Sequence, residues 1–353
     1  MRALFVNPFI YDFAAFDLWL RPLGLLYLAS IAREYTHAEI YWLDTLDRQA
    51  HQARYRFGRD GRGKYDRQIL EKPDIYRSVP RNYARYGMTV DRLDVALSLL
   101  PVEIELIFVT SLMTYWVDGV NFTISRLRNR FPKARIVIGG ILPSLLKQKV
   151  SAYVDGDIFI EGSGERALLN ILKEAGCKLS VSADCIQDID RLPFPAMELL
   201  GGQRVLPLLT SRGCPFNCHY CASALLIDRF VERSADSIYR EILHFHDRCG
   251  TTDFVIFDDA FLIHKKERFF KVFERLISNQ KSIRFHTPNG IHAREIDRQT
   301  AEILYKSGFK TIRLSFEATD QTILKSSDNK VTVRQMEQAV ENLLDAGYRA
   351  GEI

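Results

Sequence analysis

The sequence predicts an α/β protein with two domains, a doubly wound parallel sheet followed by a barrel-type series of β/α units. Its 353 residues exceed the usual length of a single domain. Apolar, strand-like runs alternate with helical patterns, and strands without polar alternation are typical of parallel sheets buried on both faces. This rhythm stops within 176–203, where Leu192-Pro193-Phe194-Pro195 favours extended backbone, and then restarts. We therefore expect a first domain at 1–175, a linker at 176–203 and a second domain at 204–353.

The first domain contains five predicted strands and a helical pattern over residues 23–32. The strands are expected at 3–8, 38–44, 105–111, 135–140 and 157–161. A second helical pattern precedes the fourth strand. Strands that alternate with helices in this way predict a doubly wound unit with helices on both faces.

An insertion rich in Arg and Tyr, at about 48–100, separates the second and third strands. Arg and Tyr together can stack on bases or bind phosphate, which would place a nucleic acid or a nucleotide tail there. Acidic residues break the positive field of the segment, and the net charge of the whole chain is only +4. We therefore favour a solvated insertion or lid anchored by its tyrosines, and we do not expect a nucleic-acid partner.

The second domain repeats strand and helix four times. Strands are expected at 205–211, 253–259, 283–287 and 311–317, and helices at 234–249, 265–279, 297–307 and 333–346. Glycines after the last two helices are typical of helix ends. Repeated β/α units of this length predict a barrel, whose functional residues lie at the carboxyl ends of the strands.

The composition excludes several protein classes. With 47% hydrophobic and 26% charged residues the chain is neither disordered nor stapled by disulfides. No apolar run approaches the ~20 residues that span a bilayer, and the first residues lack the pattern of a secretory signal. We therefore expect no membrane span and a cytoplasmic location.

Three of the six cysteines form a Cys-x3-Cys-x2-Cys loop that follows the first strand of the second domain. They are Cys214, Cys218 and Cys221. Three thiolates on one short loop can bind three irons of a [4Fe-4S] cluster and leave the fourth iron open. A zinc knuckle that includes His219 is the alternative, but zinc loops favour a second, distant pair of ligands, which the sequence lacks. Cys177, Cys185 and Cys249 have no such context.

This loop, with an aromatic residue before its last cysteine, resembles the signature of the radical SAM superfamily. The resemblance implies a partial (β/α)6 barrel in which Cys214, Cys218 and Cys221 ligate the cluster and the open iron chelates S-adenosylmethionine (SAM). Tyr220 then packs near the adenine. Reduction of the cluster, by a flavodoxin or ferredoxin-type partner, cleaves SAM to a 5′-deoxyadenosyl radical.

Other positions follow from the same resemblance. Asp258 and Asp259 end the second barrel strand, where many members have a Gly-Gly-Glu stretch that contacts the methionine amine. They are candidates for SAM or for substrate, with a solvated helix N-cap as the alternative. Glu317, at the end of the fourth strand, is the candidate for the SAM ribose. Asn289 and Arg294 follow the third strand and are weaker candidates for the cofactor, with a surface salt bridge as the equal alternative for Arg294.

The first domain resembles the cobalamin-binding domain of the B12-binding radical SAM class. The resemblance is carried by Asn7-Pro8, residues 22–29, Thr110-Ser111, Gly139-Gly140 and residues 161–165. It implies that Ser111, Gly139, Gly140, Gly162 and Glu165 surround the nucleotide tail of cobalamin. No Asp-x-His-x-x-Gly motif occurs, so no histidine is expected below the cobalt, and loss of cobalamin is the alternative.

The predicted function is SAM cleavage at the cluster for cobalamin-dependent methylation or rearrangement of an unactivated carbon in a small molecule. A methylthiotransferase is a second interpretation. Such enzymes resemble this arrangement but carry three further cluster cysteines in the first domain. This interpretation is disfavoured because no cysteine precedes Cys177 here. A non-catalytic cluster-bearing sensor or scaffold is a third. Neither the substrate nor the oligomeric state follows from the sequence.

The length of the second domain predicts a truncated barrel. Only 153 residues follow residue 200, whereas a complete eight-unit barrel takes about 250 residues. About four and a half units fit, and Ala350-Gly351-Glu352-Ile353 should begin the fifth strand. We therefore expect a fragment with an open strand edge that associates with other chains.

Overall fold

The computed structural model describes residues 1–51, 58–182, 186, 188–227, 229–320 and 330–353. The chain forms two compact units, Met1–Gly202 and Gln203–Ile353. The second unit begins within one residue of the expected barrel start. Described residues of the expected linker pack in the first unit instead, because their backbone carbonyls find donors on the first helix. Ser30 Oγ donates to the Phe194 carbonyl at 2.6 Å, and the Tyr35 hydroxyl donates to the Arg191 carbonyl at 3.0 Å.

The first unit contains a five-stranded parallel sheet in the order β10-β9-β8-β1-β4. The strands are β1 (Arg2–Asn7), β4 (Glu39–Asp44), β8 (Leu106–Ser111), β9 (Arg135–Gly140) and β10 (Ile158–Phe159). All five expected strands are present. The order of winding reverses between β1 and β8, and such a switch point is where open α/β sheets bind ligands.

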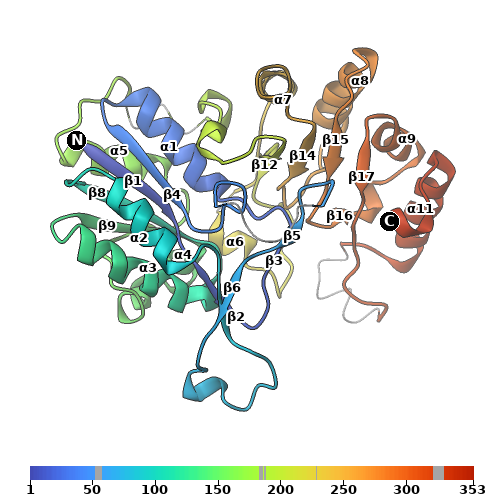
Figure 1. Ribbon diagram of the computed structural model, residues 1–353. Helices are drawn as coiled ribbons and strands as arrows, with labels where there is room; N and C mark the ends of the chain where they lie inside the picture. Colours follow the sequence, from blue (N-terminus) through green and yellow to red (C-terminus); the bar gives the residue numbers. More distant parts are fainter. Residues whose placement is uncertain (52–57, 183–185, 187, 228, 321–329) are drawn as a thin grey trace. The chain divides into compact units, whose positions relative to one another are not determined.

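Helices cover both faces of this sheet (Figure 1). They are α1 (Leu23–Tyr35), α2 (Val90–Leu99), α3 (Val117–Arg130), α4 (Ile141–Leu146) and α5 (Glu165–Glu174), with short turns η2 (Thr114–Trp116), η3 (Lys147–Ala152), η5 (Ile189–Arg191) and η6 (Met197–Leu199). Leu4 and Val6 join the core beneath α2 and α3. Helix α1 contacts β1, β4 and α5. The expected doubly wound architecture is confirmed.

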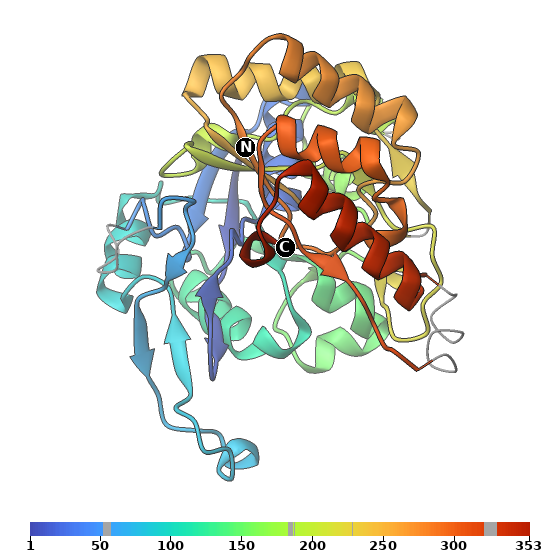
Figure 2. The ribbon, with the colours of Figure 1, turned by 90° about the vertical axis from the view of Figure 1, so that its right-hand side faces the viewer.

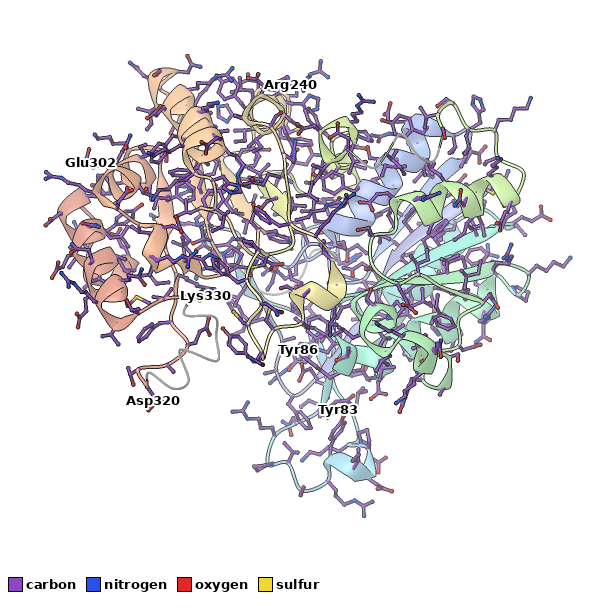
Figure 3. All side chains as sticks on the ribbon, turned by 180° about the vertical axis from the view of Figure 1, so that it is seen from behind. Tyr83, Tyr86, Arg240, Glu302, Asp320 and Lys330 are labelled. Carbon is purple, nitrogen blue, oxygen red and sulfur yellow. The ribbon has the colours of Figure 1, made fainter. Side chains whose placement is uncertain are left out.

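The insertion pairs with residues 10–17, and together they form an antiparallel arm that projects from the first unit (Figure 2). Its elements are β2 (Ile10–Asp12), β3 (Phe16–Asp17), β5 (Gly63–Lys64), β6 (Arg67–Ile69), η1 (Asp74–Tyr76) and β7 (Ala84–Tyr86), and residues 52–57 lie outside the described part. The rings of Tyr65, Tyr83 and Tyr86 are buried. Figure 3 shows Tyr83 farther out along the arm than Tyr86. Buried tyrosines favour the interpretation in which these side chains anchor the insertion.

The second unit is built on a four-stranded parallel sheet in the order β11-β14-β15-β17. The strands are β11 (Val205–Leu208), β14 (Asp253–Ile256), β15 (Arg284–His286) and β17 (Phe309–Thr311). The α-helices are α6 (Ser223–Leu226), α7 (Ala235–Cys249), α8 (Lys271–Ser278), α9 (Arg298–Lys306) and α11 (Val333–Ala346). Two short turns, the π-helical η7 (Lys266–Phe270) and η8 (Ala293–Glu295), precede α8 and α9. Stacked Phe254, Phe285 and Phe309 fill the core beneath the helices.

Two sequence expectations for this unit are wrong. The fourth strand was expected at 311–317, but the sheet strand β17 ends at Thr311, after a last hydrogen bond from the Thr287 backbone N–H to the Thr311 carbonyl. The chain then forms β18 (Leu314–Ser315), which pairs with β16 (Ile291–His292). Residues Ala350–Glu352, expected to begin a fifth strand, form the 3₁₀ turn η9, which is closed by a hydrogen bond from the Arg349 backbone to the Glu352 side chain.

No helix among the described residues is long and apolar enough to cross a membrane.

Candidate functional site

The three cysteines lie on a loop that is closed at its base by two short antiparallel strands. These are β12 (Ser211–Arg212) and β13 (Val231–Glu232). Gly213 begins the loop at φ +76°, and a Cβ there would lie 2.9 Å from the Arg229 carbonyl oxygen. Only glycine adopts that backbone without strain. Within the loop, the Cys221 backbone N–H donates to the Cys218 carbonyl at 3.0 Å.

The thiols of this loop are chemically suited to a cluster. None of the five described cysteines forms a disulfide, and Cys185 lies outside the described residues. Burial raises the pKa of the Cys214 thiol, so iron binding has to displace its proton. Across the described part of the chain, no three His, Cys, Asp or Glu side chains converge on a metal position. The donor set is nevertheless that of a [4Fe-4S] cluster with one open iron, namely three thiols in eight residues.

Asp258 holds the start of the loop through its carboxylate. Its Oδ1 accepts from the Thr210 backbone N–H at 2.7 Å, and its Oδ2 accepts from the hydroxyls of Thr210 and Ser211 at 2.5 Å each. Arg268 Nη1 lies 3.4 Å from the same Oδ2. Arg268 Nη2 donates to the carbonyls of Phe261 and Ile263. All four hydrogen-bonding side chains are buried. These contacts occupy the Asp258 carboxylate, and a role of this residue toward SAM or substrate stays a prediction.

Asp259 occupies a different environment, exposed beside the cysteines. Its Oδ2 lies 3.4 Å from the Ser223 hydroxyl, and the Ser223 backbone N–H is 3.4 Å from the Cys221 sulfur. Partial desolvation and the neighbouring Asp258 raise the pKa of the Asp259 carboxyl. Of the two aspartates, Asp259 therefore presents its carboxylate to the cysteine loop.

Tyr220 and Glu317 are brought together as a hydrogen-bonded pair. Lys330 Nζ donates to Glu317 Oε1 at 3.1 Å, and the Tyr220 hydroxyl bonds to the same carboxylate. Partial burial opposes ionisation, but these two hydrogen bonds lower the pKa of Glu317. Lys330 is labelled in Figure 3. The sequence singled out Tyr220 and Glu317 separately, whereas Lys330 was missed because only the fold brings it to them.

Residues after the third barrel strand surround the aromatic residue of the loop. The centroid of the Phe216 ring lies 4.8 Å from that of the His292 ring. The guanidinium carbon of Arg294 lies 4.4 Å from the same Phe216 centroid. Asn289 Nδ2 donates to the Phe257 carbonyl at 3.1 Å. His292 was not predicted from the sequence, because a single histidine in an apolar context carries no local signal.

In the first unit, two serines join the strand ends that carry the predicted glycines. Ser111 Oγ donates to the Gly139 carbonyl at 3.0 Å and accepts from the Leu142 backbone N–H at 3.0 Å. Ser144, which the sequence analysis missed, donates to the Gly140 carbonyl at 2.7 Å and accepts from the Gly162 N–H at 2.9 Å. The ends of β8 and β9 and the turn after β10 are therefore fixed relative to one another.

The two neighbouring glycines serve different purposes. Gly140 has φ +95°, and a Cβ there would lie 2.5 Å from the Ser111 carbonyl oxygen, so the backbone itself requires glycine. A Cβ at Gly139 would meet no atom within 4 Å. Gly139 thus leaves open space at the strand end where a ligand can approach the backbone closely. Glu165 is buried in the first turn of α5.

The end of β1 carries a buried amide with spare hydrogen-bonding capacity. Asn7 Nδ2 donates to Asp44 Oδ1 at 2.7 Å, whereas Asn7 Oδ1 has no partner among the described residues. Burial and the nearby Asp47 raise the pKa of the Asp44 carboxyl to about 7. Asn7 lies at the switch point of the sheet, where ligands of open α/β sheets bind.

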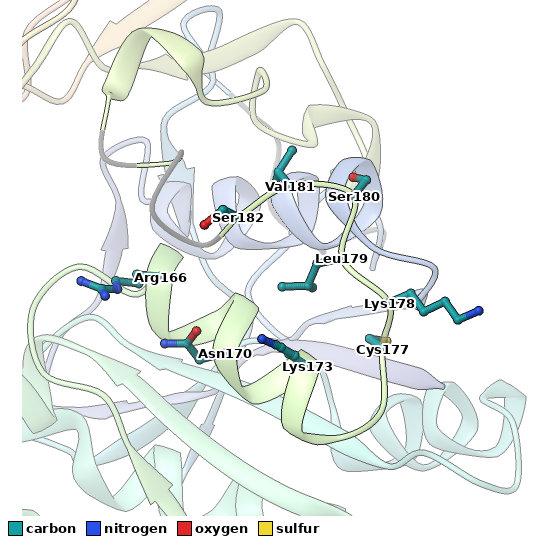
Figure 4. Close-up of a pocket in the computed structure, with 9 residues that line it drawn as sticks. All are labelled: Arg166, Asn170, Lys173, Cys177, Lys178, Leu179, Ser180, Val181 and Ser182. Atoms are coloured by element: carbon teal, nitrogen blue, oxygen red, sulfur yellow. The ribbon is translucent and has the colours of Figure 1, made fainter.

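A separate hollow of about 790 Å³ lies beside α5 (Figure 4). Its lining consists of Arg166, Asn170, Lys173 and the segment Cys177, Lys178, Leu179, Ser180, Val181 and Ser182. It contains none of the residues that the sequence analysis proposed for a ligand.

A comparison with known protein families finds a match for the second unit. Residues 208–353 match the model of the radical SAM superfamily. This match confirms the resemblance indicated by the cysteine loop.

Curated relatives include two methyltransferases. Cytidylyl-2-hydroxyethylphosphonate methyltransferase of Streptomyces wedmorensis is 22% identical, over 86% of this chain and 62% of that protein. An uncharacterized methyltransferase of Pyrococcus horikoshii is 26% identical, over 47% of this chain and 37% of that protein. The chain spans less than two thirds of the length of either relative.

Two solved structures share the fold across nearly the whole chain. The radical SAM methyltransferase TsrM from Kitasatospora setae, with cobalamin and a [4Fe-4S] cluster bound, has a TM-score of 0.67 at 14% identity, covering 98% of this chain and 65% of that one. The cobalamin-dependent SAM radical enzyme OxsB, with aqua-cobalamin bound, has a TM-score of 0.65 at 14% identity, covering 99% and 48%. The predicted fold class is therefore confirmed.

Proposed function

We propose that this chain, whose residues 208–353 match the radical SAM superfamily, cleaves SAM reductively at a [4Fe-4S] cluster and uses cobalamin to methylate an unactivated carbon. The observation that carries the proposal is the cysteine loop, tethered at both ends. Pairing of β12 with β13 closes its base, and the buried Asp258 network fixes the backbone at Thr210. A loop held in this way keeps three thiols at the carboxyl end of a barrel strand, where barrel chemistry takes place.

Each part of the site has a proposed task. Cys214, Cys218 and Cys221 hold the cluster, which when bound supplies the electron that cleaves the sulfonium bond. Asp259 accepts a hydrogen bond from the methionine amine. The Glu317 carboxylate accepts from the ribose hydroxyls, and the ring of Tyr220 packs near the adenine. The lowered pKa of Glu317 keeps it ionised, as an acceptor has to be.

The first unit is the proposed cobalamin site. The open backbone at Gly139 admits a nucleotide tail, and the Asn7 amide oxygen offers a hydrogen-bond acceptor at the switch point. Gly140, Gly162, Ser111 and buried Glu165 hold the surrounding loops. Cobalamin bound there supplies a carrier for the methyl group. Because the sequence lacks an Asp-x-His-x-x-Gly motif, we propose that no histidine occupies the lower face of cobalt.

The proposal includes a small-molecule substrate and a one-electron donor of the flavodoxin or ferredoxin type. It also places the protein in the cytoplasm, where thiols stay reduced and a cluster can be assembled.

The test is the loading of both cofactors onto anaerobically reconstituted protein. We expect about four iron per chain and uptake of one cobalamin in equilibrium dialysis. Cys218→Ala should lose the iron and keep the cobalamin, because the two sites use different units. Cys249→Ala, altered in the last turn of α7, is the matched control and should keep both. Full iron in the Cys218 variant, or no cobalamin uptake by the wild-type chain, would overturn the respective half of the proposal.

A further inference from the structure

His292 has a buried ring nitrogen without a hydrogen-bond partner. The residue ends β16 and is 2% exposed. Within the described residues, no group bonds to its Nδ1. A buried donor or acceptor left in this way costs about 1–3 kcal/mol. A nitrogen of this kind at the end of β16 therefore points to a ligand that completes it.

The imidazole packs directly on the cysteine loop. Its ring meets the Phe216 ring edge to face, at 4.8 Å between centroids and 77° between planes. Phe216 stands between Cys214 and Cys218 in the sequence. The guanidinium of Arg294, two residues after the end of β16, lies over the Phe216 ring. The loop that carries the three cysteines is thus a direct neighbour of the His292 ring.

The charges around His292 favour an anionic ligand. Lys330 and Arg294 act on it as nearby cations, with only Glu317 opposing them. Burial and these cations lower the pKa of His292 to about 3, so the ring is neutral near pH 7 and has one N–H to donate. A neutral donor among cations is suited to a negatively charged acceptor.

We propose that His292 donates a hydrogen bond from Nδ1 to an anionic acceptor of the cluster–SAM assembly, either a cluster or cysteine sulfur or the SAM carboxylate. This inference rests on the proposed function. His292 is then a positioning residue that acts on the cofactors and needs no proton transfer. Hydrogen bonds to cluster sulfurs stabilise the reduced, more negative cluster and raise its reduction potential.

The test compares His292→Phe, which keeps an aromatic ring but no donor, with His292→Asn, whose amide can replace the Nδ1 donor. Iron content is measured first, and the reduction potential is then determined by EPR-monitored titration without SAM. Loss of one hydrogen bond to a charged acceptor should lower the equilibrium constant for cluster reduction about tenfold. This corresponds to a reduction potential lower by about 59 mV for a one-electron couple. His292→Asn should recover most of that shift.

Titration with SAM distinguishes the two acceptors. A sulfur acceptor predicts a lower potential in His292→Phe before SAM is added. A carboxylate acceptor predicts an unchanged reduction potential and about tenfold weaker SAM binding. SAM binding is measured by the change of the EPR signal during the titration. If the variant carries full iron and neither quantity moves, or if Asn fails to rescue the defect, His292 has no such role. A wild-type chain that assembles no cluster would instead overturn the proposed function, and this inference with it.

Discussion

The carboxylate of Asp258 accepts the Thr210 backbone N–H at 2.7 Å, which fastens the end of β14 to the backbone just before the cysteine loop. The Arg268 guanidinium lies on the same carboxylate, and both side chains are buried. Removing the acid would leave three donors without their acceptor, and Glu232, 3.3 Å from the guanidinium, would be the acid still paired with the buried Arg268. The position of the loop start therefore depends on this aspartate.

We expect Asp258→Ala to lower the free energy of unfolding by about 3 kcal/mol, the usual result of breaking a buried ion pair. Cluster assembly should fall with it. The matched control is Asp259→Ala, because Asp259 is exposed and should change stability by no more than about 0.5 kcal/mol. Urea denaturation of both variants measures this, and equal stabilities would show that the Asp258 network is not structural.

The adjacent glycines of β9 should respond oppositely to alanine. Gly140→Ala forces a Cβ to within 2.5 Å of the Ser111 carbonyl at φ +95°, and we expect a loss of about 1–3 kcal/mol in stability. Gly139→Ala meets only open space and should fold normally, while the added methyl group reduces cobalamin uptake. Thermal denaturation and equilibrium dialysis give the two readouts. A Gly139 variant with unchanged cobalamin affinity would place the nucleotide tail elsewhere.

Asp44 should make the stability of the first unit depend on pH. Its pKa is raised from 3.8 to about 7 by burial, so the folded state binds a proton more tightly than the unfolded state. Stability should therefore fall as pH rises from about 4 to about 7 and level off above that. Asp44→Asn removes this proton and should flatten the curve, whereas Asp91→Asn, on the exposed surface of α2, should leave it intact. The free energy of unfolding is measured in urea between pH 5 and 8, and parallel curves for wild type and Asp44→Asn would contradict the prediction.

The sequence was sufficient wherever the information was local. The strands of the first sheet are continuous apolar runs, as at Ile107 and Val109, and the cysteine loop is recognised by spacing alone. The same holds for the N-caps Ser234 and Asp297, which begin α7 and α9. Periodicity and cap chemistry act over a few residues and are visible in any sequence.

Features that arise from distant pairing could not be predicted. The strand expected at 311–317 is divided because its first part pairs with β15 up to Thr311, whereas Leu314–Ser315 pairs with β16. Ser144 joins Gly140 to Gly162 across two loops, and Lys330 reaches Glu317 only in the folded chain. Asp258 was visible as an acid at a strand end, but its burial with Arg268 distinguishes it from Asp259. Partner choice of this kind is set by tertiary packing.

The most direct test of the central claim is SAM cleavage by the reconstituted chain. The protein is incubated anaerobically with SAM and dithionite, and 5′-deoxyadenosine is quantified by chromatography, with Cys218→Ala as the cluster-free control and Cys249→Ala as the matched thiol control. The account predicts 5′-deoxyadenosine from the wild-type and Cys249→Ala proteins and none from Cys218→Ala. A wild-type protein that carries its full cluster but leaves SAM intact, or equal product from Cys218→Ala, would contradict it.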